Sequence, residues 1–199
     1  MTGDSAPINL TNHFLIAMPG LEDSLFGKSV VYVCEHTARG ALGLVINKPT
    51  EMNLPALFEK VELGLKRIDL TDNPVFQGGP VQTERGFVLH EPIYIGADNQ
   101  SEALYASTMS IPGGLEMTTS KDVLEALASG NGPKKVLITL GYAAWGEGQL
   151  ESELGENSWL TVDATREVIF DTPVAERYER ALGLLGLQSW MISNQVGHA

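Results

Sequence analysis

The stretch VVYVCEHTARGALGLVINKP, residues 30–49, decides the fold. Between Ser29 and Glu35, the residues VVYVC are β-branched, aromatic or apolar at every position. This pattern is typical of a strand covered on both faces. TARG predicts a turn, and Ala41–Asn47 predicts a second buried strand that ends at Lys48-Pro49. We therefore expect a hairpin in the centre of a β-sheet.

Further strands and helices are predicted on both sides of this hairpin. The predicted strands are short apolar runs bounded by Gly, Pro or polar residues: His13–Met18, Phe87–His90, Ala103–Ile111, 113–117, Val136–Tyr142, and a closing hairpin of WLTVD (159–163) with EVIFD (167–171). The predicted helices are Leu54–Val61 after an Asn53 N-cap, the segment TTSKDVLEALASG with Thr119 and Asp122 resembling a capping box, Gln149–Leu154, and a last helix that starts at Thr172-Pro173. Early hairpins with interspersed helices predict an α+β fold: a single domain, residues 1–199, with a mixed, mostly antiparallel β-sheet flanked by helices.

Composition places the chain among ordinary globular proteins. Of its 199 residues 43% are apolar and 19% are charged, which suffices for a substantial core. The single cysteine excludes an intrachain disulfide and fits a reducing cytosol. The start of the chain lacks the pattern of a signal peptide, and the longest apolar runs are the size of strands. We therefore expect a cytoplasmic protein that does not act in a membrane.

The net charge argues against direct contact with nucleic acid. The chain carries 13 basic and 25 acidic residues, a net charge of −12, and a field of this sign repels phosphate backbones. The largest basic clusters in sequence are the pairs Lys66-Arg67 and Lys134-Lys135. A nucleic-acid binder is therefore the least favoured class.

Cys34 and His36 allow two interpretations. Residues two apart on a regular strand face the same side, with Cα atoms about 6.5–7 Å apart, so the pair is a candidate nucleophile and base. The same face also carries Val30 and Tyr32, an apolar wall that raises the pKa of a thiol. Glu35 faces the other way and cannot orient the imidazole. We favour a structural core cysteine and keep a thiol- or His-dependent enzyme as the alternative.

His90 is the second candidate base, and the histidine spacing does not indicate a metal. No H-x-x-x-H, H-x-H or C-x-x-C pattern is present in the sequence. Neither a metal nor a cofactor is therefore expected. For His90 we favour a histidine at a strand end, bonded to backbone or solvent.

Polar residues gather in the predicted loops, where binding sites usually lie. Gly78-Gly79-Pro80 is either an anion-binding turn or a tight turn in which only glycine fits. The loop after the strand at Val136–Tyr142 begins a helix with Glu147 and Glu151, which would repel phosphate. The predicted ligand or partner site comprises Asn47, Lys48, Gly78, Gly79, Pro80, Arg85, Thr118, Thr119, Ser120, Tyr142, Gly146 and Gln149.

Four long motifs, in order along the chain, resemble the YqgE/AlgH family of bacterial proteins. They are FLIAMPGLEDSLFGKSVVYVCEHTARGALGLVINKP, VFQGGPVQTERGFVLHEP, MTTSKDVLEAL and LGYAAWGEGQLESEL with NSWL. The chain departs from the usual pattern at Met117, where leucine is common, and at Ala144, where many members have glycine. The resemblance implies a cytosolic α+β domain, a label of transcriptional regulator, and no established reaction.

Three functional hypotheses follow from these observations. The first is a non-catalytic regulatory protein that binds an unidentified protein or small molecule through the loops. The second is an enzyme that uses Cys34 with His36, or His90 as a base. The third is a direct binder of nucleic acid.

Overall fold

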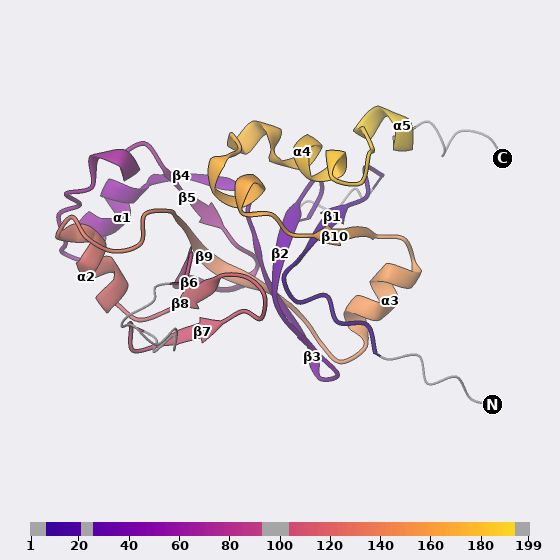
Figure 1. The fold of residues 1–199 in the computed structure, drawn as a ribbon, viewed down its shortest axis with the longest axis horizontal. Helices are drawn as coiled ribbons and strands as arrows, with labels where there is room; N and C mark the ends of the chain where they lie inside the picture. The colour runs from indigo at the N-terminus through magenta and orange to yellow at the C-terminus, as the bar shows by residue number, and fades with distance from the viewer. Residues whose placement is uncertain (1–6, 21–25, 93–103, 194–199) are drawn as a thin grey trace.

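The computed structural model describes residues 7–20, 26–92 and 104–193, and it is built on one curled sheet (Figure 1). Its main path runs β10-β1-β2-β3-β9-β6-β8-β7, with β5 joining β4 to β9. The strands of this part of the chain are β1 (His13–Ala17), β2 (Val30–Thr37), β3 (Gly40–Val45), β4 (Pro49–Asn53), β5 (Pro74–Gln77), β6 (Val81–His90), β7 (Thr108–Ser110), β8 (Glu116–Thr118), β9 (Val136–Trp145) and β10 (Trp159–Asp163). The pairs are antiparallel except for β5 with β9, which confirms a mixed, mostly antiparallel sheet in an α+β fold.

Short helices cover the sheet at separate places. They are α1 (Leu54–Lys60), α2 (Asp122–Ala128), α3 (Gln149–Gly155), α4 (Arg177–Gly183) and α5 (Ser189–Ser193), with single turns η1 (Ile68–Leu70), η2 (Glu167–Asp171) and η3 (Val174–Glu176). In Figure 1, α1 and α2 lie together at one end of the molecule. Helix α4 packs on β1 and β2, and α3 packs on β3 and β10.

Among the described residues, three apolar clusters form the core. One lies under α4 and includes Phe14, Tyr32 and Leu182. A second lies against α1 and α2, and a third lies against α3 around Trp145 and Trp159. Because β1 and β2 contribute alternate residues to the first and third clusters, the sheet is buried on both faces there.

The predicted central hairpin is confirmed: β2 and β3 pair antiparallel in the interior of the sheet. Its register shifts between Val33, which pairs with Gly43, and Glu35, which pairs with Leu42. Cys34 is therefore the extra residue of a β-bulge, and a bulge interrupts the alternation of side chains between the two faces.

The first helix begins as expected. Asn53 is the N-cap of α1, and its Oδ1 accepts a hydrogen bond from the backbone N–H of Ala56 at 3.0 Å. Leu54, Leu57 and Phe58 are buried on one side of the helix.

The predicted capping box at Thr119 is wrong. Helix α2 has Lys121 at its N-cap and no side-chain cap. The carboxylate of Asp122 instead accepts hydrogen bonds from Ser120 Oγ at 2.5 Å and from the backbone N–H of Ala106 at 2.8 Å. Asp122 thus ties the preceding loop to α2, and the backbone N–H of Thr119 donates to Ser107.

The predicted closing hairpin is also wrong. WLTVD forms β10, but it pairs with β1, at the other end of the chain, in the register His13 with Asp163. EVIFD forms the helical turn η2, because the adjacent residues Val168 and Ile169 are both buried on the same core. Of the predicted strand Ala103–Ile111, only Thr108–Ser110 is a strand, and Ala103 lies outside the described residues.

Candidate functional site

Cys34 and His36 lie on opposite faces of the sheet. Cys34 is 1% exposed and packs with Tyr32 in the cluster under α4. His36 pairs with Ala41, which belongs to the cluster against α3. The bulge therefore separates the two side chains that regular alternation would have placed together. Burial also raises the pKa of the Cys34 thiol.

His36 is oriented by groups that lie far away in the sequence. Its Nδ1 accepts a hydrogen bond from the backbone N–H of Leu10 at 3.0 Å, so Nε2 carries the proton and donates to Glu151 Oε1 at 2.6 Å. The pKa of Glu151 is lowered by its own backbone N–H and then by His36. Glu151 belongs to α3, so this pair fastens the helix to the end of β2.

We expect native Cys34 to resist alkylation, because its thiol is buried and protonated. Iodoacetamide at neutral pH should modify the unfolded protein at least about 100 times faster than the native protein, as intact mass will show. Cys34→Ala should lower the free energy of unfolding by about 1 kcal/mol. Rapid native alkylation with unchanged melting of Cys34→Ala would restore the thiol as a candidate nucleophile.

His90 is fully buried and its ring nitrogens are engaged. Nδ1 lies 2.8 Å from the carbonyl oxygen of Glu91, which only accepts, so Nδ1 donates there. Nε2 then accepts from Thr118 Oγ1 at 2.8 Å, and Thr118 Oγ1 lies 2.9 Å from Thr108 Oγ1, whose hydroxyl is also 3.2 Å from the carbonyl oxygen of Tyr105. The chain of hydrogen bonds joins β6, β8 and β7, and a proton acceptor in this place has no contact with solvent.

Asn47 and Lys48 hold the connection between β1 and β2. Asn47 Oδ1 accepts from the backbone N–H of Val30 at 2.9 Å, and its Nδ2 donates to the carbonyl of Lys28 at 2.8 Å. Lys48 Nζ donates to the carbonyl of Gly27 at 2.6 Å. Both side chains thus make hydrogen bonds that shape the fold.

Gly78 and Gly79 pass against the backbone of β9. The N–H of Gly78 donates to Leu140 and its carbonyl accepts from Val45. A Cβ on Gly78 would overlap Gly141 and Thr139, and a Cβ on Gly79 would overlap Tyr142 and Ala143. The next residue, Pro80, is exposed. The two glycines allow a close approach between strands, and the amide of Gly78 is bonded to protein rather than open to an anion.

Four more of the predicted residues, Arg85, Tyr142, Gly146 and Gln149, lie at two further places. The guanidinium of Arg85 lies 5.7 Å from the ring centroid of Phe87, whose edge contacts Tyr142 at 5.4 Å between centroids. Beyond the end of β9, the backbone N–H of Gly146 donates to Gln149 Oε1 at 3.0 Å. The side chain of Gln149 is thus engaged by the loop that precedes α3.

Thr118, Thr119 and Ser120 line a pocket of about 260 Å³ between α1 and α2. We call it the α1–α2 pocket, and it is lined by Leu57, Val61, Glu84, Gly86, Val88, Thr118, Thr119, Ser120, Lys121, Leu124, Ile138 and Leu140. Its walls are largely apolar, while Glu84 and Lys121 are exposed at the rim. Within the described residues neither of these two charges forms an ion pair. The other members of the predicted site do not line it.

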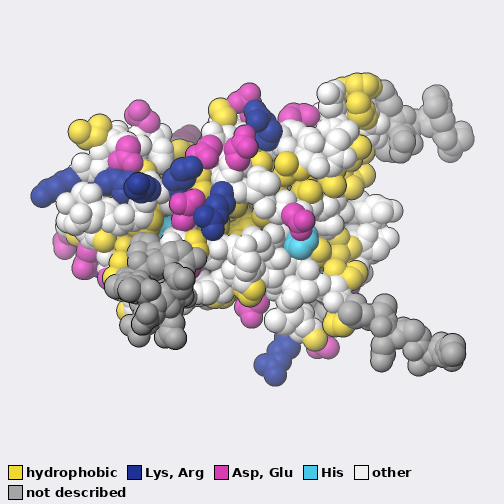
Figure 2. All heavy atoms as spheres, in the orientation of Figure 1, with side chains coloured by type: hydrophobic (Ala, Val, Ile, Leu, Met, Phe, Trp, Pro, Cys, Tyr) yellow, Lys and Arg dark blue, Asp and Glu magenta, His cyan; other side chains and the backbone are white. Residues whose placement is uncertain are grey.

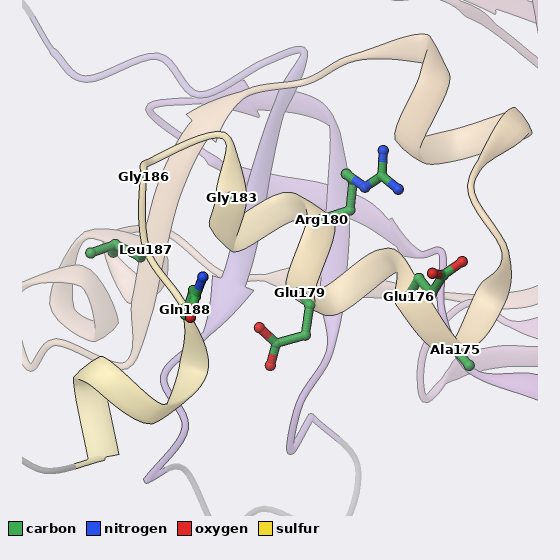
Figure 3. A pocket seen from close by; sticks show the side chains of 8 residues that line it. All are labelled: Ala175, Glu176, Glu179, Arg180, Gly183, Gly186, Leu187 and Gln188. Atoms are coloured by element: carbon green, nitrogen blue, oxygen red, sulfur yellow. The ribbon is translucent and has the colours of Figure 1, made fainter.

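A larger cavity, of about 660 Å³, lies along α4 and the turn that follows it (Figure 3). Its polar side chains do not converge: Glu179 and Gln188 lie near one another, whereas Arg180 extends away from them. The cavity is therefore large, but its polar side chains are not arranged to hold a ligand in one orientation.

The charged surface is mixed in sign. Figure 2 shows Lys and Arg side chains over the end with α1 and α2 and over the centre, with Asp and Glu side chains among them. Several of the basic groups are paired, such as Arg67 with Asp69 at 2.6 Å and Lys135 with Asp171 at 2.9 Å. A phosphate backbone would therefore meet acidic groups on the same face.

The part of the chain that the structure describes has neither a metal-binding cluster nor a membrane-spanning helix. There, no three or more His, Cys, Asp or Glu side chains are grouped so that they could hold a metal ion. Among the helices of the same residues, none has the length and hydropathy needed to cross a bilayer.

Comparison with known proteins defines the class. The family described as AlgH-like matches residues 14–190. UPF0301 proteins of Variovorax paradoxus and of an Acidovorax strain are 71% and 72% identical, each over the full length of both chains. The chain belongs to the AlgH-like family.

Two solved structures share the fold. The solution structure of the AlgH protein from Pseudomonas aeruginosa is 45% identical, with a TM-score of 0.74 over 98% of each chain. A crystal structure of a Corynebacterium diphtheriae protein is 16% identical, with a TM-score of 0.68 over 88% of this chain and 87% of that one. The resemblance inferred from the four motifs is thereby confirmed.

Proposed function

We propose that this protein is a non-catalytic, cytoplasmic binding protein with a regulatory role, in which residues 1–199 act as one domain. Its α1–α2 pocket receives an apolar group of a protein partner or small ligand. The observation that carries this proposal is the composition of the pocket, with apolar walls, hydroxyl groups at Thr119 and Ser120, and exposed charges of both signs at the rim.

The size of the pocket favours one anchoring group over a whole ligand. Cavities that enclose drug-sized molecules usually measure about 300–1,000 Å³, and this pocket measures about 260 Å³. Such a volume suits one aromatic or branched side chain, and interfaces commonly place their energetically dominant residue in a pocket of this kind. Lys121 and Glu84 would then select the charges around the anchor.

The arrangement of the candidate nucleophile and bases speaks for binding rather than catalysis. Cys34 and His36 face different clusters, and His90 is enclosed by its hydrogen-bond partners. A regulatory effect through a partner also avoids the repulsion that a net charge of −12 imposes on contact with DNA.

The test is affinity capture from a lysate of the cells that encode the protein, with retained proteins and small molecules measured by mass spectrometry. Leu124→Trp fills the pocket from α2, whereas Glu125→Trp places the same group on an exposed position of that helix. We expect at least one retained species to fall about tenfold with Leu124→Trp only. If the parent protein and both variants retain the same species in the same amounts, the pocket is not the binding site.

A further inference from the structure

A third cavity, a crevice, lies where β5 and β9 begin to pair. The two strands pair only at Phe76 with Thr139 and at Gln77 with Leu140. A cavity of about 240 Å³ beside this point is lined by residues of both strands and by residues 169–174. Apolar side chains, including Leu54, Phe76 and Ile138, share its lining with polar atoms. It shares Ile138 with the α1–α2 pocket but is otherwise lined by different residues.

Arg177, at the start of α4, lines this crevice and is 6% exposed. Its Nε donates to the carbonyl of Thr172 at 3.0 Å and its Nη1 to the carbonyl of Ile46 at 2.5 Å. The guanidinium lies 5.0 Å from the ring centroid of Phe76. A guanidinium has five N–H donors, so three remain without a hydrogen-bond partner in the described part of the chain.

The charge of Arg177 is not compensated by a carboxylate. Within the described residues it forms no ion pair, and its two acceptors are neutral carbonyls. Burial alone lowers the pKa of Arg177 to about 10. A buried cation without an opposite charge is costly. The hydrogen bonds to two carbonyls explain where the side chain lies, but they do not explain why a charged residue is buried there.

Asn73 and Asp171 are two other polar residues that line the crevice. The side-chain amide of Asn73 has no hydrogen bond within the described residues and can donate to an incoming oxygen. Asp171 also lines the crevice, but its carboxylate is paired with Lys135 Nζ at 2.9 Å rather than with Arg177. An anion that bound beside Arg177 would therefore supply the opposite charge that the crevice lacks.

We propose that this crevice binds the carboxylate of a small organic acid, with Arg177 pairing with the carboxylate and the apolar side chains of the lining contacting the rest of the molecule. The volume equals that of about eight water molecules at about 30 Å³ each, which suits an acid with a short apolar body. A planar carboxylate can accept two parallel bonds from the guanidinium fork. The apolar side chains of Leu54, Phe76 and Ile138 suit the body of a carboxylic acid better than inorganic phosphate, which would need polar groups around all its oxygens.

The test uses benzoate as the probe and benzamide as its neutral counterpart, added to the full chain up to about 10 mM. The Arg177 Nε–Hε resonance is followed by NMR. We expect a saturable shift with benzoate, at least tenfold weaker binding of benzamide, and a smaller shift with inorganic phosphate at equal concentration. Phosphate that binds more tightly than benzoate would overturn the assignment to a carboxylic acid.

Three variants separate binding from folding. Arg177→Gln should abolish saturable binding, as followed by backbone amide shifts around the crevice. This variant also loses the hydrogen bonds to Thr172 and Ile46. If it unfolds, two variants that keep Arg177 test the binding instead. Val174→Phe should narrow the crevice and weaken benzoate binding about tenfold, whereas Asp171→Asn should tighten it about threefold by removing a negative charge.

The proposal is overturned if benzoate gives no saturable shift, or if benzamide binds as well as benzoate. Unchanged affinity in both Val174→Phe and Asp171→Asn also overturns it. None of these outcomes bears on the α1–α2 pocket, whose test relies on Leu124→Trp, so the two proposals can fail separately.

Discussion

Gly79→Ala is expected to destabilise the protein by about 4 kcal/mol or more, enough to unfold much of it. Gly79 has φ +156°, and a Cβ there would overlap the backbone of Tyr142 and Ala143 in β9. Backbone atoms cannot move aside as the end of a flexible side chain can. The β5–β6 loop would therefore have to separate from β9, to which Gly78 is hydrogen-bonded.

Thermal unfolding of matched glycine variants measures this effect. At this chain length each kcal/mol corresponds to about 2–4 °C, so Gly79→Ala should lower Tm by about 8–16 °C. The control is Gly86→Ala in β6, where an added Cβ has no atom within 4 Å and the expected change is within about 0.5 kcal/mol. Equal melting of the two variants would mean that the loop yields easily and is free to adapt to a ligand.

Thr118→Val should lower the free energy of unfolding by about 2–3 kcal/mol, although the side chain keeps its shape. Thr118 is fully buried, and its hydroxyl links His90 Nε2 to Thr108 Oγ1. Valine would leave the imidazole nitrogen without a donor in a place that water does not reach. The cost arises from that unsatisfied group more than from the lost bond itself.

Thr119→Val is the matched control on the next residue. Thr119 is half-buried, and its side chain makes no hydrogen bond within the described residues. Chemical denaturation should place Thr119→Val within about 0.5 kcal/mol of the parent, and the α1–α2 pocket should remain open. A Thr118→Val variant as stable as Thr119→Val would show that the buried hydrogen-bond chain contributes nothing to the fold.

Local patterns predicted the parts of the fold that local interactions determine. The apolar run through Val30 and the turn before Ala41 gave the central hairpin, and the N-cap of α1 was readable from Asn53 alone. The wrong predictions share a cause: their outcome depends on distant segments. The strand β10 has its partner in β1, and η2 is helical because Val168 and Ile169 both face a core made elsewhere.

The candidate sites were harder to predict for the same reason. A bulge at Cys34 leaves no mark in the alternation of apolar residues, yet it separates that thiol from His36. Glu151 orients His36 across 115 positions of sequence. Arg177 was missed because a cation on a helix is usually solvent-exposed, whereas this one is enclosed by contacts with Ile46 and Phe76, which are distant in the sequence.

The place of β9 in the sheet also governs when the chain can fold. This strand pairs with β3, β5 and β6, all of which precede it in the sequence. Synthesis adds about 5–20 residues per second, so about 5–20 s pass between completion of β3 at Val45 and of β9 at Trp145. During that time the nascent chain presents unpaired strand edges, which readily pair with other chains. The unfinished polypeptide on the ribosome is thus more exposed to aggregation than the folded protein.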